Sequence, residues 1–66
     1  MRLSVNGETR TVPDPASLAD LVSTLTDRTT GIAVAVNGDV VPRTQWTGQA
    51  LADGDAIEIL TAVQGG

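Results

Sequence analysis

The chain ends in Val63-Gln64-Gly65-Gly66, and its final carboxylate is the group best suited to chemistry. Glycine lacks a Cβ, so a tail ending in two glycines can adopt backbone angles closed to other residues and can enter a narrow channel in a partner. Chain ends are also often frayed, and two glycines alone form a weak motif. The dipeptide by itself leaves both interpretations open.

Two residue types that carry much of enzyme chemistry are missing, because the 66 residues include no cysteine and no histidine. The chain therefore has no thiolate nucleophile, no disulfide, and no imidazole to act as general base or metal ligand. Asp53-Gly54-Asp55 has a spacing similar to metal-binding loops but lacks the further oxygen ligands and closing glutamate of a calcium loop, so we interpret it as a turn. We expect no metal site, no cofactor bound by this chain and no autonomous catalysis.

The charge balance disfavours nucleic acid as a partner. Eight acidic and four basic side chains give a net charge of -4, and the arginines are scattered along the chain as Arg2, Arg10, Arg28 and Arg43. A phosphate backbone is bound mainly by concentrated positive charge. The acidic surface either steers the chain toward a basic docking face on an enzyme or simply keeps it soluble.

Length and hydropathy predict one small domain that does not enter a membrane. Sixty-six residues lie near the lower limit for a self-sufficient core. The longest apolar run, residues 32–36, is far too short to span a bilayer, and the first residues lack the pattern of a secretory signal. We expect a soluble, cytoplasmic protein.

The first residues predict a hairpin. Met1, Leu3 and Val5 alternate with polar residues, which is the period of a strand with one buried face. Asn6-Gly7 tolerates positive φ and favours a type I′ turn into a second strand over residues 8–12. We expect this asparagine, like the one in Asn37-Gly38, to have no role beyond the geometry of its turn.

A short amphipathic helix follows the hairpin. Ser17 is a good N-cap, and Asp20 three residues later completes the pattern of a capping box. The apolar residues then recur on one face of the helix, at Leu18, Leu21, Val22 and Leu25.

The second half of the chain predicts three more strands. In residues 32–36 the β-branched residues alternate with Ala33 and Ala35, so the alanines are expected to face away from the core. Asn37-Gly38 then predicts a second hairpin into a brief strand at Val40-Val41. An irregular stretch follows, and the last strand covers residues 56 to about 62.

This order of elements predicts an α+β fold of the β-grasp type. A single helix among strands too short for two sheets packs best on one face of a mixed sheet of four to five strands. In this arrangement the last strand lies beside the first and the tail projects beyond the sheet. We therefore expect a β-grasp domain over residues 1–62 and a flexible Gly-Gly tail over residues 63–66.

Several segments of the chain resemble one family of β-grasp proteins. They are residues 35–43, Trp46, Asp53-Gly54-Asp55 and the terminal Gly65-Gly66. Together they make the chain similar to the ThiS family, the ubiquitin-like sulfur carriers of thiamine thiazole biosynthesis. The likeness extends along nearly the full length, and it is more specific than the terminal glycines alone.

The resemblance implies a covalent role for the carboxylate of Gly66. A ThiF-like adenylating enzyme would join AMP to it using ATP and magnesium, and sulfur from a cysteine persulfide would then displace AMP to leave a thiocarboxylate. A ThiG-like thiazole synthase would take the sulfur. Gly66 is then a substrate, and the catalytic groups belong to the partners.

The alternation along the last strand also predicts a docking surface. If Ile57 and Ile59 point at the helix, Leu60 emerges on the open side of the sheet beside Ala33 and Ala35. This apolar patch would hold a partner while Val63, Gln64 and Gly65 thread into its active site. Leu60 could equally be an isolated exposed leucine, which is common on protein surfaces.

Two other residues, Trp46 and Arg43, are of types that can contact a partner. Trp46, the only aromatic residue, is expected to cover one end of the core rather than to anchor a partner. Arg43 is expected to be a solvated loop charge.

Three other functions share this pattern. They are the small subunit of molybdopterin synthase or another β-grasp sulfur carrier, a ubiquitin-like protein modifier, and a β-grasp module that binds without covalent chemistry.

Overall fold

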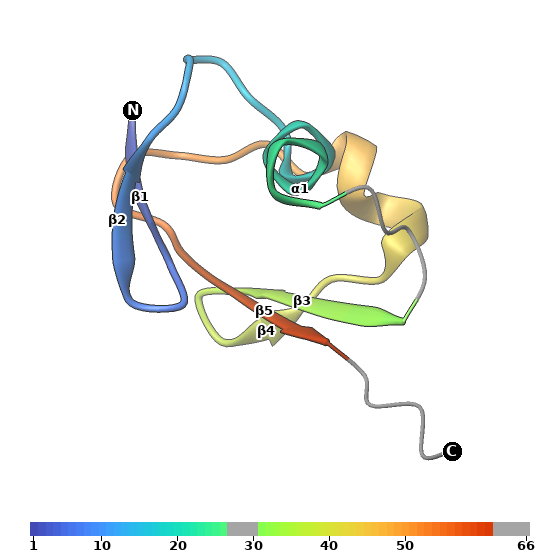
Figure 1. Ribbon diagram of the computed structural model, residues 1–66. Coiled ribbons are helices and arrows are strands. Elements are labelled where there is room, and N and C mark those ends of the chain that lie inside the picture. Colours follow the sequence, from blue (N-terminus) through green and yellow to red (C-terminus); the bar gives the residue numbers. More distant parts are fainter. Residues whose placement is uncertain (27–30, 62–66) are drawn as a thin grey trace.

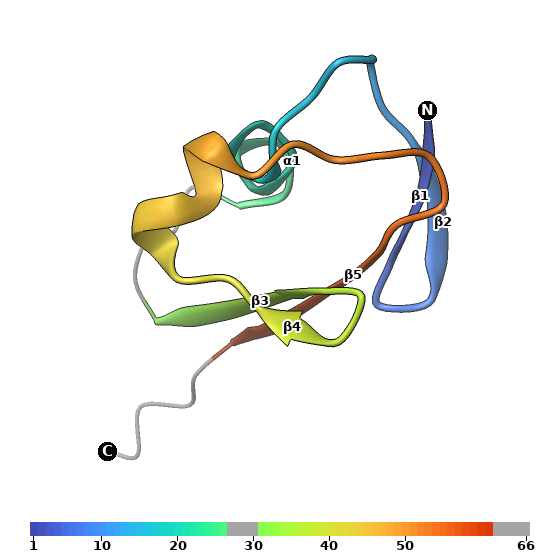
Figure 2. The same ribbon diagram turned by 180° about the vertical axis from the view of Figure 1, so that it is seen from behind.

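One helix lies over one face of a five-stranded sheet in the computed structural model, which describes residues 1–26 and 31–61 (Figure 1). The elements are β1 (Arg2–Val5), β2 (Glu8–Thr11), α1 (Leu18–Leu25), β3 (Ile32–Val36), β4 (Asp39–Val40), the 3-10 helix η1 (Arg43–Gly48) and β5 (Ala56–Thr61). We call the face under α1 the covered face and the opposite one the open face. No described helix or strand lies on the open face (Figures 1 and 2). The predicted α+β, β-grasp fold is confirmed.

The last strand lies at the centre of the sheet, whose order is β2-β1-β5-β3-β4. β5 pairs in parallel with β1 through Ser4 opposite Ala56 and Val5 opposite Ile57. On its other side it runs antiparallel to β3 over five residue pairs. The prediction that the last strand lies beside the first is confirmed, and the chain leaves the sheet from its central strand.

The two Asn-Gly pairs form the two hairpin turns. Asn6 and Asn37 have φ of 50° and 52°, and the glycines that follow have φ of 84° and 87°, as a type I′ turn requires. The second turn sets Val36 opposite Asp39 and Ala35 opposite Val40. β4 therefore begins one residue earlier than the predicted Val40-Val41. Val41 is not part of this strand and is buried in the core.

The start of α1 is a complete capping box. The Ser17 N–H donates to Asp20 Oδ2 at 3.0 Å, and the Asp20 N–H donates to Ser17 Oγ at 3.1 Å. The first of these bonds, with a smaller contribution from the Ser17 side chain, lowers the pKa of Asp20 below its usual 3.8. These bonds satisfy N–H groups that a helix start leaves without intrahelical partners.

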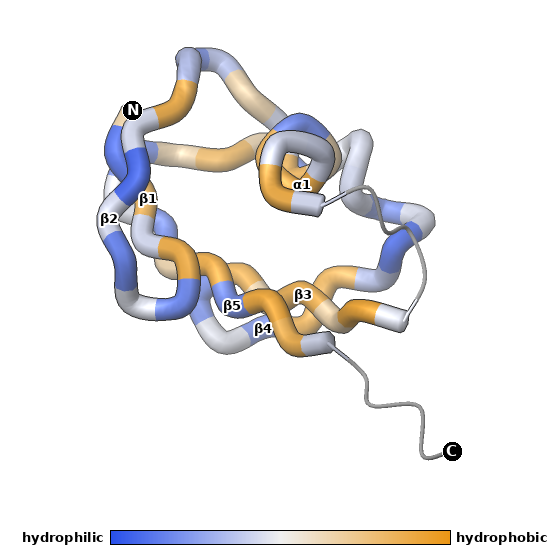
Figure 3. Tube along the Cα trace, viewed as in Figure 1, coloured by the Kyte–Doolittle hydropathy of each residue, from blue (hydrophilic) through white to orange (hydrophobic). Residues whose placement is uncertain are grey.

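The core fills the space between α1 and the covered face. Alternate strand residues point into it, as the sequence pattern predicted for Leu3, Val5, Val34 and Ile57. β3 and β5 are hydrophobic over much of their length, whereas β2 is polar (Figure 3). The buried set is Leu3, Val5, Leu18, Leu21, Val22, Val34, Val36, Val41, Trp46, Leu51 and Ile57.

Trp46 belongs to the core, as predicted. It is 6% exposed, and its indole Nε1 donates to the Val41 carbonyl at 2.8 Å. The segment that carries it is the 3-10 helix η1, where the sequence predicted only irregular structure. None of the described helices is long and apolar enough to cross a membrane.

Candidate functional site

The predicted covalent site follows the central strand. Thr61 is the last residue of β5 and of the described chain. Val63, Gln64, Gly65 and Gly66 lie outside the described residues, as does the predicted boundary between a domain of residues 1–62 and a tail of residues 63–66. The described part of the candidate site is therefore the region of the molecule that leads to this tail.

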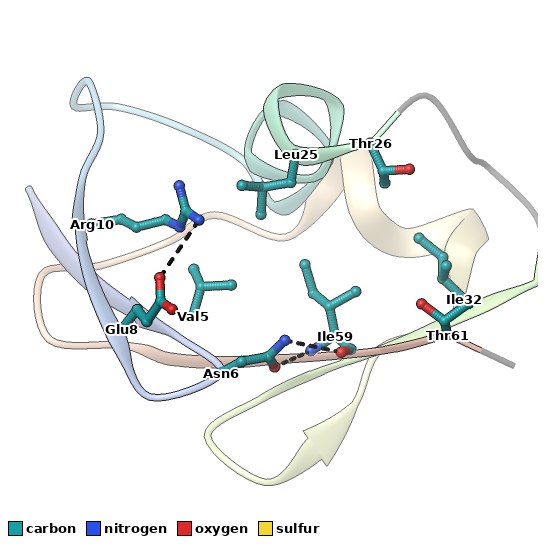
Figure 4. Close-up of a pocket in the computed structure, with 9 residues that line it drawn as sticks. All are labelled: Val5, Asn6, Glu8, Arg10, Leu25, Thr26, Ile32, Ile59 and Thr61. Carbon is teal, nitrogen blue, oxygen red and sulfur yellow. Dashed lines mark hydrogen bonds and ion pairs between the residues drawn. The ribbon is translucent and has the colours of Figure 1, made fainter.

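Both turn asparagines hold the backbone of β5. Asn6 Nδ2 donates to the Ile59 carbonyl at 3.2 Å, and the Ile59 N–H donates to Asn6 Oδ1 at 2.8 Å (Figure 4). On the other side, the Ala56 N–H donates to Asn37 Oδ1 at 2.9 Å, and Asn37 Nδ2 donates to Asp55 Oδ1 at 3.0 Å. The expectation that these asparagines serve only turn geometry was wrong.

The Asn6 bonds extend the sheet beyond the end of β1. The paired residues of β1 and β5 end at Val5 and Ile57, and the amide side chain then bonds the N–H and carbonyl of Ile59 as a further strand residue would. This fixes the second half of β5, from which the chain continues toward Gly66.

The open face carries the residues predicted for docking. Ala33 lies directly opposite Leu60, and Ala35 lies opposite Glu58. Directly opposite residues in an antiparallel pair point to the same side of the sheet. Because Val34, Val36 and Ile57 point into the core, all four of these residues belong to the open face. Leu60 is 66% exposed.

Val40 is a fourth apolar member of this surface, and it was not among the residues predicted for docking. It lies opposite Ala35 across the β3–β4 hairpin and is 72% exposed. A two-residue turn at Asn37-Gly38 fixes this register, so the signal was present in the sequence. We call Ala33, Ala35, Val40 and Leu60 the open-face patch.

The open-face patch occupies only one half of the sheet. On the other half, the outward positions of β1 and β2 are the polar residues Arg2, Ser4, Thr9 and Thr11. Val40 and Leu60 are the large hydrophobic residues most exposed among those described. Together with the two alanines between them, they form an apolar surface beside a polar half, which is typical of a contact surface.

A hollow beside the second half of β5 lies on the covered side. It has a volume of about 330 Å³ and is bordered by the hairpin, α1 and the ends of β3 and β5 (Figure 4). Among its polar side chains, Arg10 meets Glu8 at 3.9 Å and Asn6 bonds the backbone of Ile59. An exposed pair at that distance contributes little. The lining residues are Val5, Asn6, Glu8, Arg10, Leu25, Thr26, Ile32, Ile59 and Thr61.

The predicted turn at Asp53-Gly54-Asp55 is confirmed, and its carboxylates accept hydrogen bonds within the chain. Asp53 Oδ1 accepts from the Arg2 N–H at 2.7 Å, and Asp55 Oδ2 accepts from the Ala52 N–H at 2.8 Å. Gly54 has φ of 89°. The turn thus ties the start of β5 to β1. Arg43 is exposed at the start of η1, as predicted.

The family model described as the ThiS family matches residues 3–66. This match covers the open-face patch, both turn asparagines and the terminal Gly65-Gly66. The chain belongs to the ThiS family.

Known members of the ThiS family agree with this assignment. The sulfur carrier protein ThiS of Escherichia coli (strain K12) is 30% identical over 66 residues, which are the whole of both chains. The crystal structure of the thiamine biosynthesis protein ThiS from Geobacter metallireducens has a TM-score of 0.86 and 33% identity, with both chains fully covered. A solution structure of a thiamine biosynthesis protein from that organism gives a TM-score of 0.82 at 33% identity, covering all of this chain and 88% of the other. The resemblance inferred from the sequence is confirmed.

Proposed function

We propose that this chain is a sulfur carrier whose cargo is held at the carboxylate of Gly66, for thiazole formation in thiamine biosynthesis. The observation that carries the proposal is the ThiS family match over residues 3–66, which includes the terminal Gly65-Gly66. The names of the relatives support it, since one is a sulfur carrier protein and the others are thiamine biosynthesis proteins.

The proposed chemistry starts with activation of the carboxylate. A carboxylate is a poor electrophile because its negative charge repels nucleophiles and it offers no good leaving group. A ThiF-like adenylating enzyme therefore uses ATP and magnesium to form an acyl adenylate on Gly66, with release of pyrophosphate. The terminal sulfur of a cysteine persulfide then attacks the acyl carbon, and AMP leaves.

Release of the thiocarboxylate needs one further step. The attack leaves an acyl persulfide, and a second thiol cleaves its sulfur–sulfur bond, forming a disulfide with the donor cysteine. The Gly66 thiocarboxylate then donates sulfur to a ThiG-like thiazole synthase. In this scheme the partners supply the catalytic groups, and the chain itself has no thiol or imidazole to offer.

The open-face patch is the proposed docking surface for the adenylating enzyme. It lies on β3, β4 and the exposed side of β5, the strand that leads toward the tail. A partner that covers Leu60 and Val40 would remove exposed apolar area from water while residues 63–66 enter its active site.

Intact-mass analysis tests the proposal. The chain is incubated with ATP, magnesium, a sulfur donor and the adenylating enzyme of the same organism, whose activity is checked separately. We expect one oxygen to be replaced by sulfur at Gly66, and no exchange in a variant that lacks Gly66. An unchanged mass with an active enzyme would refute the carrier role, and a stable amide bond to a partner lysine would indicate a modifier.

The pathway is tested by the enzyme that consumes the loaded chain. We expect the thiocarboxylate to support thiazole formation by thiazole synthase. Transfer to a molybdopterin synthase large subunit instead would refute the thiamine assignment while leaving the carrier chemistry intact.

A further inference from the structure

Glu58 is a charged residue of the open face, at the border of the open-face patch. It lies directly opposite Ala35, which in turn lies opposite Val40. Along its own strand, the next residues on the same face are Ala56 and Leu60. Residues two apart on a strand are about 7 Å apart, so the carboxylate shares this surface with the exposed leucine.

No described cation of this chain pairs with Glu58. Residues 1–26 and 31–61 form one ion pair, between Arg10 and Glu8. Both residues line the hollow on the covered side. Arg2, the other charged residue of the open face, is on β1 and pairs across the sheet with Thr11 on the polar half. In the free protein, water solvates the exposed Glu58 carboxylate.

Covering the patch changes the surroundings of this carboxylate. A partner surface that covers the patch as far as Ala35 and Leu60 also removes water from Glu58, which is a neighbour of both. A carboxylate buried without a counter-charge is strongly unfavourable, whereas a partner cation placed against it makes the same burial acceptable. Glu58 thus discriminates between partner surfaces that are simply apolar and those that carry a matching charge.

Building on the function proposed above, we propose that Glu58 determines docking specificity, and that the adenylating enzyme covers the open-face patch with an apolar surface bearing one arginine for this carboxylate. Arginine fits better than lysine because its planar guanidinium binds a carboxylate with two parallel hydrogen bonds and is more weakly hydrated. The net charge of -4 on the chain also favours approach of a basic enzyme face.

The test compares binding of the adenylating enzyme to the wild type, Glu58→Gln, Glu58→Arg and the control Glu8→Gln. The control Glu8→Gln also removes one negative charge, but on the covered side, where the Glu8 side chain is 77% exposed. We expect Glu58→Gln to weaken binding at least about tenfold and to reduce its dependence on ionic strength, because a desolvated partner charge loses its counterpart. Glu58→Arg should weaken it further, and Glu8→Gln should bind as the wild type does.

A charge swap identifies the partner group. Each surface arginine of the enzyme is changed to glutamate in turn, and one of these variants should restore binding of Glu58→Arg. Equal affinity and equal salt dependence for the wild type and Glu58→Gln would overturn the assignment of Glu58, even if the wild type is loaded with sulfur. A wild type that binds but is never adenylated would instead refute the proposed function and leave the docking result standing.

Discussion

The two faces of β3 and β5 differ in what they contribute to the molecule. On the covered face, Val34, Val36 and Ile57 are 1%, 7% and 1% exposed and pack under α1. On the open face, the intervening positions of the same strands are two alanines, Glu58 and the 66% exposed Leu60. One pair of strands therefore supplies both the core that stabilises the fold and a surface that remains available to a partner.

This division follows from the period of a strand. Successive side chains point to opposite faces, so a substitution at one position can affect stability while its neighbour affects only binding. Within the open-face patch, the two alanines of β3 lie between the larger apolar residues Val40 on β4 and Leu60 on β5. We therefore expect that substitutions can disrupt the stability supplied by the covered face and the binding by the open face independently.

Truncation of Ile57 should have the largest effect on stability. Ile57→Ala removes a side chain that is 1% exposed and leaves a cavity in the core, which costs about 2–5 kcal/mol. The free energy of unfolding of a 66-residue domain is roughly 3–10 kcal/mol in total, so this variant should lose a large part of its stability. The matched change on the open face, Leu60→Ala, should shift the free energy of unfolding by less than about 0.5 kcal/mol.

Urea denaturation followed by circular dichroism measures both variants. Similar losses of stability for Ile57→Ala and Leu60→Ala would show that the two faces are not separate in the way proposed.

A charge on the open-face patch should block docking without unfolding the domain. We expect Leu60→Asp to weaken binding of the adenylating enzyme at least about tenfold, since it places a carboxylate in an apolar contact that has to lose water. Thr9→Asp adds the same charge on the polar half of the open face, opposite Ser4, and should have little effect.

Adenylation rates at several carrier concentrations, measured by mass spectrometry, separate these variants. If the open-face patch is the docking surface, Leu60→Asp should be adenylated more slowly than Thr9→Asp at the same carrier concentration. A stable Leu60→Asp variant that is adenylated like the wild type would exclude the open-face patch as the binding surface.

Local patterns in the sequence were sufficient to predict most of the fold. The alternation in residues 32–36 placed Val34 in the core and both alanines on the open face, and the structure agrees. The two Asn-Gly turns and the capping box at Ser17 were predicted because each depends on residues only a few positions apart. The open-face positions of Leu60, Ala33 and Ala35 followed from the same period, although their role in binding stays a prediction.

Contacts between distant residues were not predictable in this way. Asn6 bonds Ile59, 53 positions along the chain, and nothing in the sequence near either residue indicates it. The burial of Trp46 was predicted, but the 3-10 helix that carries it was not. β4 was placed one residue late because Val40-Val41 resembles a strand more than Asp39 does, whereas the hairpin register decides where it begins.

The turn asparagines offer a finer test of how β5 is held. Asn6→Gly keeps a residue that tolerates positive φ but removes the two bonds to Ile59, so it should cost about 1–2 kcal/mol. Asn37→Gly removes the bond to the Ala56 N–H and should cost about 1 kcal/mol.

Hydrogen exchange distinguishes the two substitutions. The Ile59 amide should exchange faster only in Asn6→Gly, and the Ala56 amide only in Asn37→Gly. Unchanged exchange at both amides would mean that the asparagine side chains do not hold β5 in solution.

The smallest effect is expected at the helix start on the covered side. Hydrogen bonds from Ser17 lower the pKa of Asp20 below 3.8, so the ionised carboxylate stabilises the folded state. This contribution is fully present above the unfolded pKa and is lost as the pH falls through the lower, folded value. Asp20→Asn should therefore be less stable than the wild type near neutral pH, and the difference should shrink progressively below pH 3.8. Urea denaturation of both proteins across this range measures the difference, and a constant gap at every pH would contradict a role for the charge. Because Asp20 is on α1, on the covered side of the sheet, adenylation at neutral pH should not change.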